Sequence, residues 1–201
     1  STMIASLLFV AAAYLIGSIS FAVVVSRVFG LPDPHEYGSG NPGATNVLRT
    51  GNKGAAALTL LGDGAKGWLA VWLAQRLGPD FGVAAWTVPV VAFAVFLGHV
   101  YPVFHRFAGG KGVATAAGVV LALYWPLGLA LLAIWLVMAF VFKISSLAAL
   151  TAAALTPIGM FLVAGNTLTS WMMIPIALLL IWRHRSNIQQ LVTGKERSIG
   201  R

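Results

Sequence analysis

Long uncharged stretches, separated by short polar segments, dominate the chain. No Asp, Glu, Lys or Arg occurs in residues 1–26, 81–98, 112–142 or 144–182. A helix that crosses a bilayer needs about 20 mostly apolar residues, and residues 3–25 are long enough to form one. A signal peptide is the alternative for this first stretch, but no positive charge precedes it. The pattern predicts an all-α, polytopic integral membrane protein.

Breaks within the longer stretches set the number of helices. As a single helix, residues 112–142 would extend about 46 Å, whereas the hydrocarbon core is about 30 Å thick. Trp125 and Pro126 supply a break there, and residues 164–167 divide the last stretch in the same way. A further helix is expected over residues 54–75. The sequence therefore predicts a bundle of about seven transmembrane helices, forming one domain over residues 1–201.

The composition supports a membrane protein and narrows its chemistry. Hydrophobic residues make up 59% of the chain and charged residues 9%, whereas soluble domains have roughly 45–50% and 25%. The absence of cysteine excludes disulfides, thiolate metal sites and a cysteine nucleophile. Only five residues are Asp or Glu, which argues against a carboxylate-rich metal cage. The net charge of +8 indicates anionic lipids or substrates rather than nucleic acid as partners.

The basic residues gather in alternate connections between the predicted helices. Cytoplasmic segments of membrane proteins carry an excess of Lys and Arg. With the C-terminus cytoplasmic and the N-terminus outside, the inner segments hold 11 of the 13 basic residues, and the outer loops hold only Arg76. The inner basic residues are Arg27, Arg49, Lys53, Arg106, Lys111, Lys143, Arg183, Arg185, Lys195, Arg197 and Arg201.

The first polar segment, residues 38–49, has the composition of an anion-binding loop. Its glycines let backbone N–H groups approach a ligand closely, and Arg49 can hold a phosphate with two hydrogen bonds. A surface turn between helices is the alternative. The candidate ligand-binding residues here are Gly38, Ser39, Gly40, Asn41, Gly43, Thr45, Asn46 and Arg49.

The second polar segment ends in Gly109, Gly110, Lys111 and Gly112, directly before a predicted helix. Open backbone, a point charge and a helix N-terminus together favour a phosphate site. The spacing is not that of a Walker A loop, so we infer no nucleoside triphosphatase. His99, at the end of the preceding helix, is a candidate general base or ligand for a hydroxyl group. A capping or interfacial histidine is the alternative.

Two further groups of polar residues are candidates for function. Asp63 and Lys66 lie inside a predicted helix, where ionisable residues are costly; at this spacing they can form a structural ion pair or serve the reaction. In the tail, His184 and Asn187 share one helix face. A basic tail that stops membrane insertion is the alternative for that segment, but neither Asn187 nor Glu196 fits it.

Several common catalytic motifs are missing. No histidine is followed five residues later by Asp, as in many acyltransferases, and neither Gly-x-Ser-x-Gly nor His-Glu-x-x-His occurs. The segment 63–67 resembles the opening of the CDP-alcohol phosphotransferase motif. That chemistry requires further aspartates to hold metal, and the chain lacks them.

Two long motifs and the tail together resemble one known family. Residues 38–49, residues 98–115 and the His184-Arg185-x-Asn187-Ile188 tail are similar to the bacterial acyl-phosphate-dependent glycerol-3-phosphate acyltransferases of the PlsY type. The resemblance implies transfer of a fatty acyl group from acyl phosphate to the 1-hydroxyl of glycerol 3-phosphate. The products are lysophosphatidic acid and inorganic phosphate, in the first acylation of phospholipid synthesis.

The resemblance also implies where and with what the protein works. We expect a monomer in the bacterial inner membrane, with the active site facing the cytoplasm. The family uses acyl phosphate and glycerol 3-phosphate without acyl-CoA, acyl carrier protein, metal or other cofactor.

The resemblance assigns residue roles as well. Ser39, Arg49, His99 and Lys111 are expected to be catalytic, and all except His99 bind phosphate groups. His99 supports the attacking hydroxyl, and whether His99 or a substrate phosphate takes its proton stays open. Glu196 is expected to close the tail over the site through a basic partner. The expected substrate-binding residues are Gly38, Gly40, Asn41, Gly43, Thr45, Asn46, Gly109, Gly110, Gly112, Ser146, His184, Asn187 and Glu196.

Two other classes of function compete with an enzyme. A transporter for a phosphorylated solute would place polar groups near the middle of the membrane, where only Asp63 and Lys66 lie. A scaffold without activity leaves the glycine-rich loops unexplained.

Overall fold

The computed structural model describes residues 1–200, and over this range the chain forms helices and loops without strands. Arg201, counted above among the basic residues, lies outside the described residues. The helices are α1 (Thr2–Gly17), α2 (Phe21–Val28), α3 (Ala44–Leu48), α4 (Lys53–Leu77), α5 (Thr87–Val100), α6 (Val113–Leu123), α7 (Trp125–Phe142), α8 (Ser145–Ala164), α9 (Leu168–Arg183) and α10 (Arg185–Val192), with short 3₁₀ turns at Gly78–Phe81 and Val103–His105.

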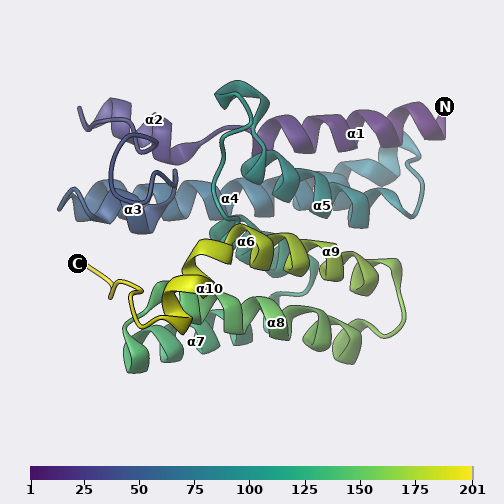
Figure 1. Ribbon diagram of the computed structural model, residues 1–201. Helices are drawn as coiled ribbons and strands as arrows, with labels where there is room; N and C mark the ends of the chain where they lie inside the picture. The colour runs from purple at the N-terminus through teal and green to yellow at the C-terminus, as the bar shows by residue number, and fades with distance from the viewer. Residues whose placement is uncertain (201) are drawn as a thin grey trace.

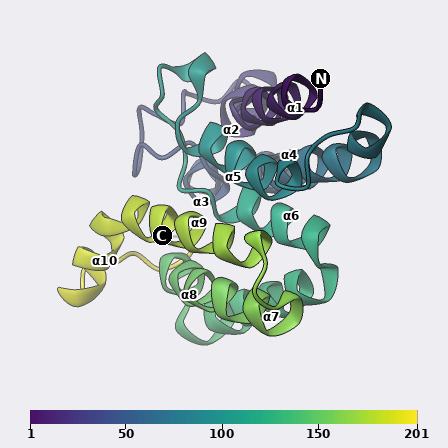
Figure 2. The same ribbon diagram turned by 90° about the vertical axis from the view of Figure 1, so that its right-hand side faces the viewer.

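The long helices lie roughly parallel in two groups (Figure 1). Viewed nearly along their axes, α1, α4 and α5 form one group, α7, α8 and α9 form the other, and α6 lies between them (Figure 2). The short helices α2, α3 and α10 lie at one end of the bundle, opposite the N-terminus (Figure 1). Loops from both halves of the sequence therefore meet at that end.

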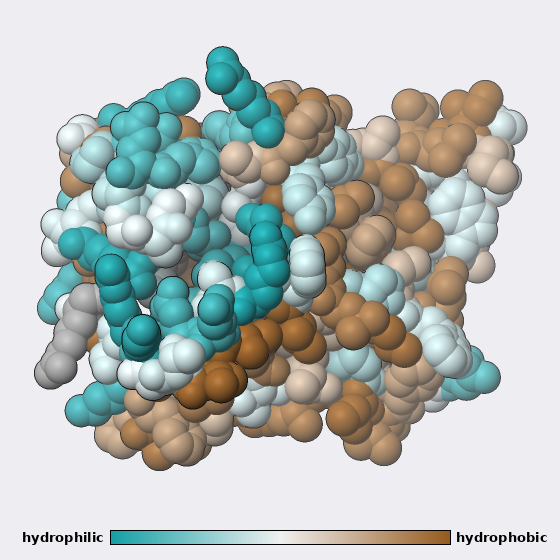
Figure 3. Space-filling view, viewed as in Figure 1, coloured by the Kyte–Doolittle hydropathy of each residue, from teal (hydrophilic) through white to brown (hydrophobic). Residues whose placement is uncertain are grey.

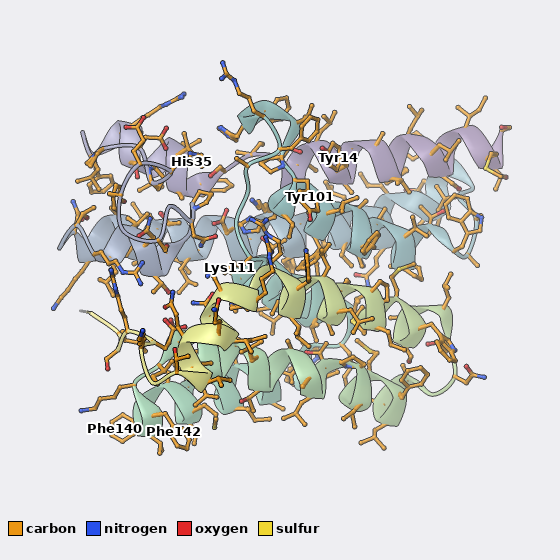
Figure 4. The ribbon with its side chains drawn as sticks, in the orientation of Figure 1. Tyr14, His35, Tyr101, Lys111, Phe140 and Phe142 are labelled. Carbon is orange, nitrogen blue, oxygen red and sulfur yellow. The ribbon has the colours of Figure 1, made fainter. Side chains whose placement is uncertain are left out.

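The surface has a polar end and an apolar remainder, just as the chain alternates between polar segments and apolar stretches. Hydrophilic residues gather at the end that carries α2, α3 and α10, and hydrophobic residues cover most of the remainder of the visible face (Figure 3). Large apolar side chains point away from the protein on this remainder, among them Phe140 and Phe142 of α7 (Figure 4). A surface of this kind fits contact with lipid.

Three segments are long and apolar enough to cross a membrane: Thr87–His105, Trp125–Phe142 and Ser145–Ala164. The bent pair α1 and α2 makes a fourth if it is counted as one span. Helices α6 and α9 are apolar but shorter, and α4 is long but contains Asp63 and Lys66. Each of the seven expected segments thus contains a helix, while three segments, or four with the bent pair, are long and apolar enough to span.

Two predicted breaks between helices are present in the structure, and the structure has a third break that the sequence did not predict. Helix α6 ends at Leu123 and α7 begins at Trp125, and α8 and α9 are separated by residues 165–167. The expectation of one continuous helix over residues 3–25 is wrong, because α1 ends at Gly17 and α2 leaves at an angle of 43°. The Ser20 hydroxyl accepts a hydrogen bond from the Val23 N–H, at 3.3 Å, and so starts a new helix.

Small residues bring the backbones of α1, α4, α5 and α6 together. A Cβ on Gly118 of α6 would lie 1.9 Å from the Gly64 carbonyl oxygen of α4, so no larger residue fits without separating the helices. A Cβ on Gly98 of α5 would lie 2.2 Å from the Tyr14 carbonyl oxygen of α1. Close approach through glycine is a usual way for membrane helices to pack. These contacts hold α4, α5 and α6 in the positions from which they line the site.

We predict that Gly118→Ala lowers the thermal unfolding midpoint of the detergent-solubilised protein by roughly 2–12 °C, because overpacking costs about 1–3 kcal/mol. Gly64→Ala on the facing helix is the matched control, since its Cβ would lie 3.5 Å from the Ala114 carbonyl oxygen, at ordinary contact distance. An unchanged midpoint for Gly118→Ala would show that the helices do not depend on this contact.

Candidate active site

A cavity with a volume of about 730 Å³ lies between α3, α4, α6, α7 and α8 and extends to the tail at the polar end. Thirteen of the seventeen residues expected to be functional line it. They are Ser39, Asn41, Gly43, Thr45, Asn46, Arg49, His99, Lys111, Gly112, Ser146, His184, Asn187 and Glu196.

The other four expected residues shape the loops and do not line the cavity. Gly38 and Gly40 have φ values of 56° and 69°, which glycine adopts readily. A Cβ on Gly109 would lie 2.2 Å from the His99 carbonyl oxygen, and a Cβ on Gly110 would lie 2.4 Å from His99 Nε2. These four glycines permit tight turns and close packing against His99, and their expected part in substrate binding stays a prediction.

Asn46 lines the cavity and also holds the first loop together. It is buried, and its Nδ2 donates to the carbonyl oxygens of Pro34 and Tyr37, at 2.9 and 3.1 Å. Its Oδ1 accepts from the Ser39 N–H at 3.1 Å and from Arg49 Nη1 at 3.0 Å. All four hydrogen-bonding positions of the amide are used within the protein. Asn46 therefore holds the loop and aims Arg49.

A chain of hydrogen bonds joins the second glycine-rich loop to the tail. Lys111 Nζ donates to Asn187 Oδ1, and Asn187 Nδ2 donates to Glu196 Oε2 at 2.8 Å. The Ser146 hydroxyl, in the first turn of α8, donates to the same carboxylate oxygen at 2.9 Å. The chain orients the Asn187 amide, because the ammonium group can only donate. In Figure 4, Lys111 lies between the two groups of helices.

Among residues 1–200, Glu196 holds the tail over the site through neutral partners and not through a basic side chain. The side chains that hydrogen-bond to it are Ser146 and Asn187, and its Oε1 accepts from the Arg197 backbone N–H at 3.1 Å. The tail is further fixed by the Ile199 N–H, which donates to the Lys143 carbonyl oxygen at 2.8 Å. The expected salt bridge is therefore replaced by neutral donors, which leaves the nearby cations available to a ligand.

Three cations line the polar part of the cavity: Arg49, Lys111 and Arg197. Burial lowers the pKa of Lys111 to about 8; Glu196 opposes this shift, while Arg183 and Arg49 add to it. Burial also lowers the pKa of Arg49, and Arg197 contributes, but a guanidinium stays charged in proteins. The excess of positive charge favours an anionic ligand. The sequence offered no sign that Arg197 differs from the other basic residues of the tail.

His184 is buried at the junction of α9 and α10. Its Nδ1 lies 2.8 Å from the Leu180 carbonyl oxygen, so Nδ1 carries the hydrogen and Nε2 is an acceptor. Burial lowers the pKa of His184 to about 4, and the Leu180 hydrogen bond only partly offsets this effect. The ring is therefore neutral at pH 7.

His99 lies at the end of α5, next to Asp63 and Lys66 of α4. Lys66 Nζ is 3.0 Å from Asp63 Oδ1 and 2.8 Å from His99 Nδ1. Both helices are needed to form this cluster, and the sequence predicted only the Asp63–Lys66 part of it. The ion pair exists, and its third member is a residue that lines the cavity.

Arg183 is the second residue whose position the sequence did not indicate. Its guanidinium donates to the carbonyl oxygens of Gly109 and Gly110, at 2.8 and 3.3 Å, and lies 5.6 Å from the centre of the Tyr101 ring. The Tyr14 hydroxyl in turn donates to the Tyr101 carbonyl oxygen at 2.7 Å (Figure 4). Arg183 therefore supports the glycine-rich loop and is more than part of a basic tail.

The rest of the cavity is apolar. Side chains from α4, α6 and α7 face it, with Trp68 and Trp135 the largest of them. The other large apolar lining residues of these helices are Leu60, Leu61, Val113, Val120, Leu121, Leu131, Leu132 and Leu136. A ligand with a charged head and an apolar tail fits this division. Within residues 1–200 no three His, Asp or Glu side chains gather so that they could hold a metal ion.

Comparison with known proteins gives one consistent match. A model of the family described as "Glycerol-3-phosphate acyltransferase" matches residues 7–194. The glycerol-3-phosphate acyltransferase of Cupriavidus pinatubonensis is 65% identical over 98% of this chain and 97% of its own, and that of Ralstonia nicotianae is 61% identical over 100% and 97%. Crystal structures of PlsY, an integral membrane glycerol 3-phosphate acyltransferase, are also similar.

The two PlsY structures are the glycerol 3-phosphate form and the lysophosphatidic acid form, with TM-scores of 0.88 and 0.87 and sequence identities of 39% and 38%. Each alignment covers 96% of this chain and 94% of the solved one. The match to the family model includes both glycine-rich loops, and the alignments with these relatives extend over nearly the whole chain. The chain belongs to the glycerol-3-phosphate acyltransferase family.

Proposed function

We propose that this enzyme transfers a fatty acyl group from acyl phosphate to the 1-hydroxyl of glycerol 3-phosphate, giving lysophosphatidic acid and inorganic phosphate. The observation that carries the proposal is the division of the cavity, with Arg49, Lys111 and Arg197 along its polar part and apolar side chains along the rest. Both substrates contain phosphate, and the donor also contains a long apolar chain. One cavity with these two regions suits both.

The chemistry requires little beyond positioning and charge. The 1-hydroxyl oxygen forms a bond to the acyl carbonyl carbon, the carbon–oxygen bond to phosphate breaks, and the phosphate leaves. The hydroxyl proton passes to an acceptor in the site. Acyl phosphate is already activated, so aligned substrates and stabilised oxyanions can account for the rate. No acyl-enzyme is needed, and none could form on cysteine in this chain.

The residues that line the cavity have roles that follow from their chemistry. Arg49 and Lys111 bind the phosphate groups, and Ser39 assists them with its hydroxyl. Ser39 Oγ accepts from the Asn41 N–H at 3.3 Å, which leaves its own O–H to donate to a substrate oxygen. His184 Nε2 offers an acceptor to a glycerol hydroxyl. Other exposed donors of the first loop, including Thr45, contribute to the same pocket.

In the membrane, we propose seven spans with the N-terminus outside and the C-terminus in the cytoplasm of a bacterium, within the inner membrane. The location of the polar residues at one end of the bundle supports this arrangement (Figure 3). The cavity then opens on the side where glycerol 3-phosphate is made. We further propose a single domain that acts as a monomer, because residues 39–49 and 184–200 of one chain already line the same cavity.

The reaction is tested with the full chain in detergent, palmitoyl phosphate and glycerol 3-phosphate. We expect phosphate release that depends strictly on glycerol 3-phosphate and equals the lysophosphatidic acid formed, with palmitoyl-CoA inactive as donor. Arg49→Ala should reduce kcat/KM by about 10- to 100-fold, since a hydrogen bond to a charged group contributes about 1.5–3 kcal/mol.

Arg185→Ala is the matched control for this assay. Arg185 lies 4.6 Å from the centre of the Trp182 ring and does not line the cavity, so its loss should leave turnover unchanged. Transfer from palmitoyl-CoA, phosphate release without glycerol 3-phosphate, or full activity in Arg49→Ala would each contradict the proposal.

The pKa of Lys111 predicts the alkaline limit of activity. A lysine whose pKa lies at about 8 loses its charge as the pH rises through 8, and the free-enzyme pKa governs kcat/KM. We expect kcat/KM for glycerol 3-phosphate to fall about tenfold per pH unit above this value. Lys111→Arg, which stays charged, should give a lower but flat profile between pH 7 and 10. The same alkaline fall in Lys111→Arg would rule Lys111 out as its cause.

The topology is tested with reporter fusions at Pro79, Trp125, Asn166 and Ile199. The proposed orientation places Pro79, Trp125 and Asn166 outside and Ile199 in the cytoplasm. The reason is that cytoplasmic segments carry the excess of Lys and Arg. A cytoplasmic signal from Asn166 would defeat the seven-span arrangement.

A further inference from the structure

The proposed roles of the residues that line the cavity do not explain why Asp63, Lys66 and His99 form a cluster. The Asp63 and Lys66 side chains are each 3% exposed, and that of His99 is 7% exposed. His99 and Asp63 line the cavity, whereas Lys66 does not. A buried ion pair beside a site residue needs a reason, because charge among apolar helices is costly.

The surroundings of Lys66 Nζ determine which group donates. Three acceptors surround it: the Ile19 carbonyl oxygen at 2.7 Å, His99 Nδ1 at 2.8 Å and Asp63 Oδ1 at 3.0 Å. An ammonium group has three N–H donors and no lone pair, so each acceptor receives one hydrogen. His99 Nδ1 must therefore present its lone pair to Lys66. In a neutral imidazole the hydrogen is then on Nε2.

The Nε2 edge of His99 lies against Gly110 of the second glycine-rich loop. A Cβ on Gly110 would lie 2.4 Å from Nε2, so the glycine keeps this edge clear. Among the described residues, 1–200, no side chain or backbone group makes a hydrogen bond to Nε2. The ring thus offers an N–H group at the cavity wall, between the two glycine-rich loops.

The break between α1 and α2 holds the ion pair in place. Ile19 and Phe21 lie at this break, where their backbone groups are released from helical hydrogen bonding. Lys66 donates to the Ile19 carbonyl oxygen at 2.7 Å, and Asp63 Oδ1 accepts from the Phe21 N–H at 3.4 Å. Since both charged groups have a second, fixed partner, Lys66 Nζ has little freedom to turn away from His99.

We propose that Asp63 and Lys66 are positioning residues that fix His99 as its Nε2–H tautomer, so that His99 acts in the site as a hydrogen-bond donor. The inference rests on the proposed function, which supplies the acceptor: a phosphate or acyl carbonyl oxygen of a substrate. A donor Nε2 has no lone pair with which to take the hydroxyl proton.

The tautomer is read directly by NMR on the full chain in detergent, labelled with ring-¹⁵N histidine and measured without substrate. His99→Gln identifies the His99 signals by their loss. We expect a protonated Nε2 and an unprotonated Nδ1 at pH 7. A protonated Nδ1 in the unaltered protein would overturn the proposal outright, with no variant needed.

Lys66→Met tests the role in the reaction, because methionine keeps the length of the side chain and cannot donate. We expect a mixture of His99 tautomers and a kcat lower by about 10- to 100-fold, with the KM for glycerol 3-phosphate nearly unchanged. Lys66→Arg restores a cationic donor and should recover the Nε2–H tautomer. Lys53→Met, at the exposed start of α4, is the matched control and should have no effect.

The outcomes separate this inference from the proposed function. If Lys66→Met keeps both the tautomer and kcat, Lys66 does not position His99. If Lys66→Met fails to fold, the tautomer of the unaltered protein and of Lys66→Arg still decides the proposal. Failure to transfer from palmitoyl phosphate would overturn the proposed function, while the tautomer, measured without substrate, would stand.

Discussion

A charged or strongly polar group between apolar helices must have a partner, and this constraint organises both the bundle and its cavity. Asp63 and Lys66 neutralise each other and also bind the backbone groups released at the α1–α2 break. Arg183 binds the carbonyl oxygens of the second glycine-rich loop. Each of these buried polar groups thus connects a loop or a helix break to a helix of the bundle. The contacts that stabilise the buried charges therefore also hold the parts of the site in place.

The cavity depends on segments that are far apart in the sequence. The first loop carries Arg49, the second carries Lys111, and the tail carries Glu196, which Ser146 of α8 holds by a hydrogen bond. The helices that carry these segments approach closely because glycines at their crossings have no side chains. Positioning of this kind requires the whole bundle to be packed, which is why loop composition alone does not specify the site.

The sequence predicted most of the helices, and most of the residues it singled out line the cavity. It failed where a local structure depends on partners that are distant in the sequence. Uncharged stretches locate α7 and α8 well because hydropathy is a local property. The α1–α2 break was missed because no charge or proline marks it; its released backbone groups are satisfied by α4, more than 40 residues away. The hydrogen bonds of Asn46 and Arg183 were missed for the same reason, since their partners become visible only when the loops are folded against the helices.

The two histidines that line the cavity offer opposite hydrogen-bonding groups. His184 directs Nδ1–H at the Leu180 carbonyl oxygen and so presents a lone pair on Nε2, whereas His99 receives a hydrogen from Lys66 and presents N–H. Each tautomer follows from the hydrogen-bonding partner of Nδ1, which is the Leu180 carbonyl oxygen for His184 and Lys66 for His99. Burial lowers the pKa of His184 to about 4 and so keeps that ring neutral. An acyl transfer between phosphorylated substrates needs a donor for a developing oxyanion and an acceptor for a hydroxyl group. Two neutral rings in different tautomers supply both without adding to the positive charge that Arg49, Lys111 and Arg197 already provide.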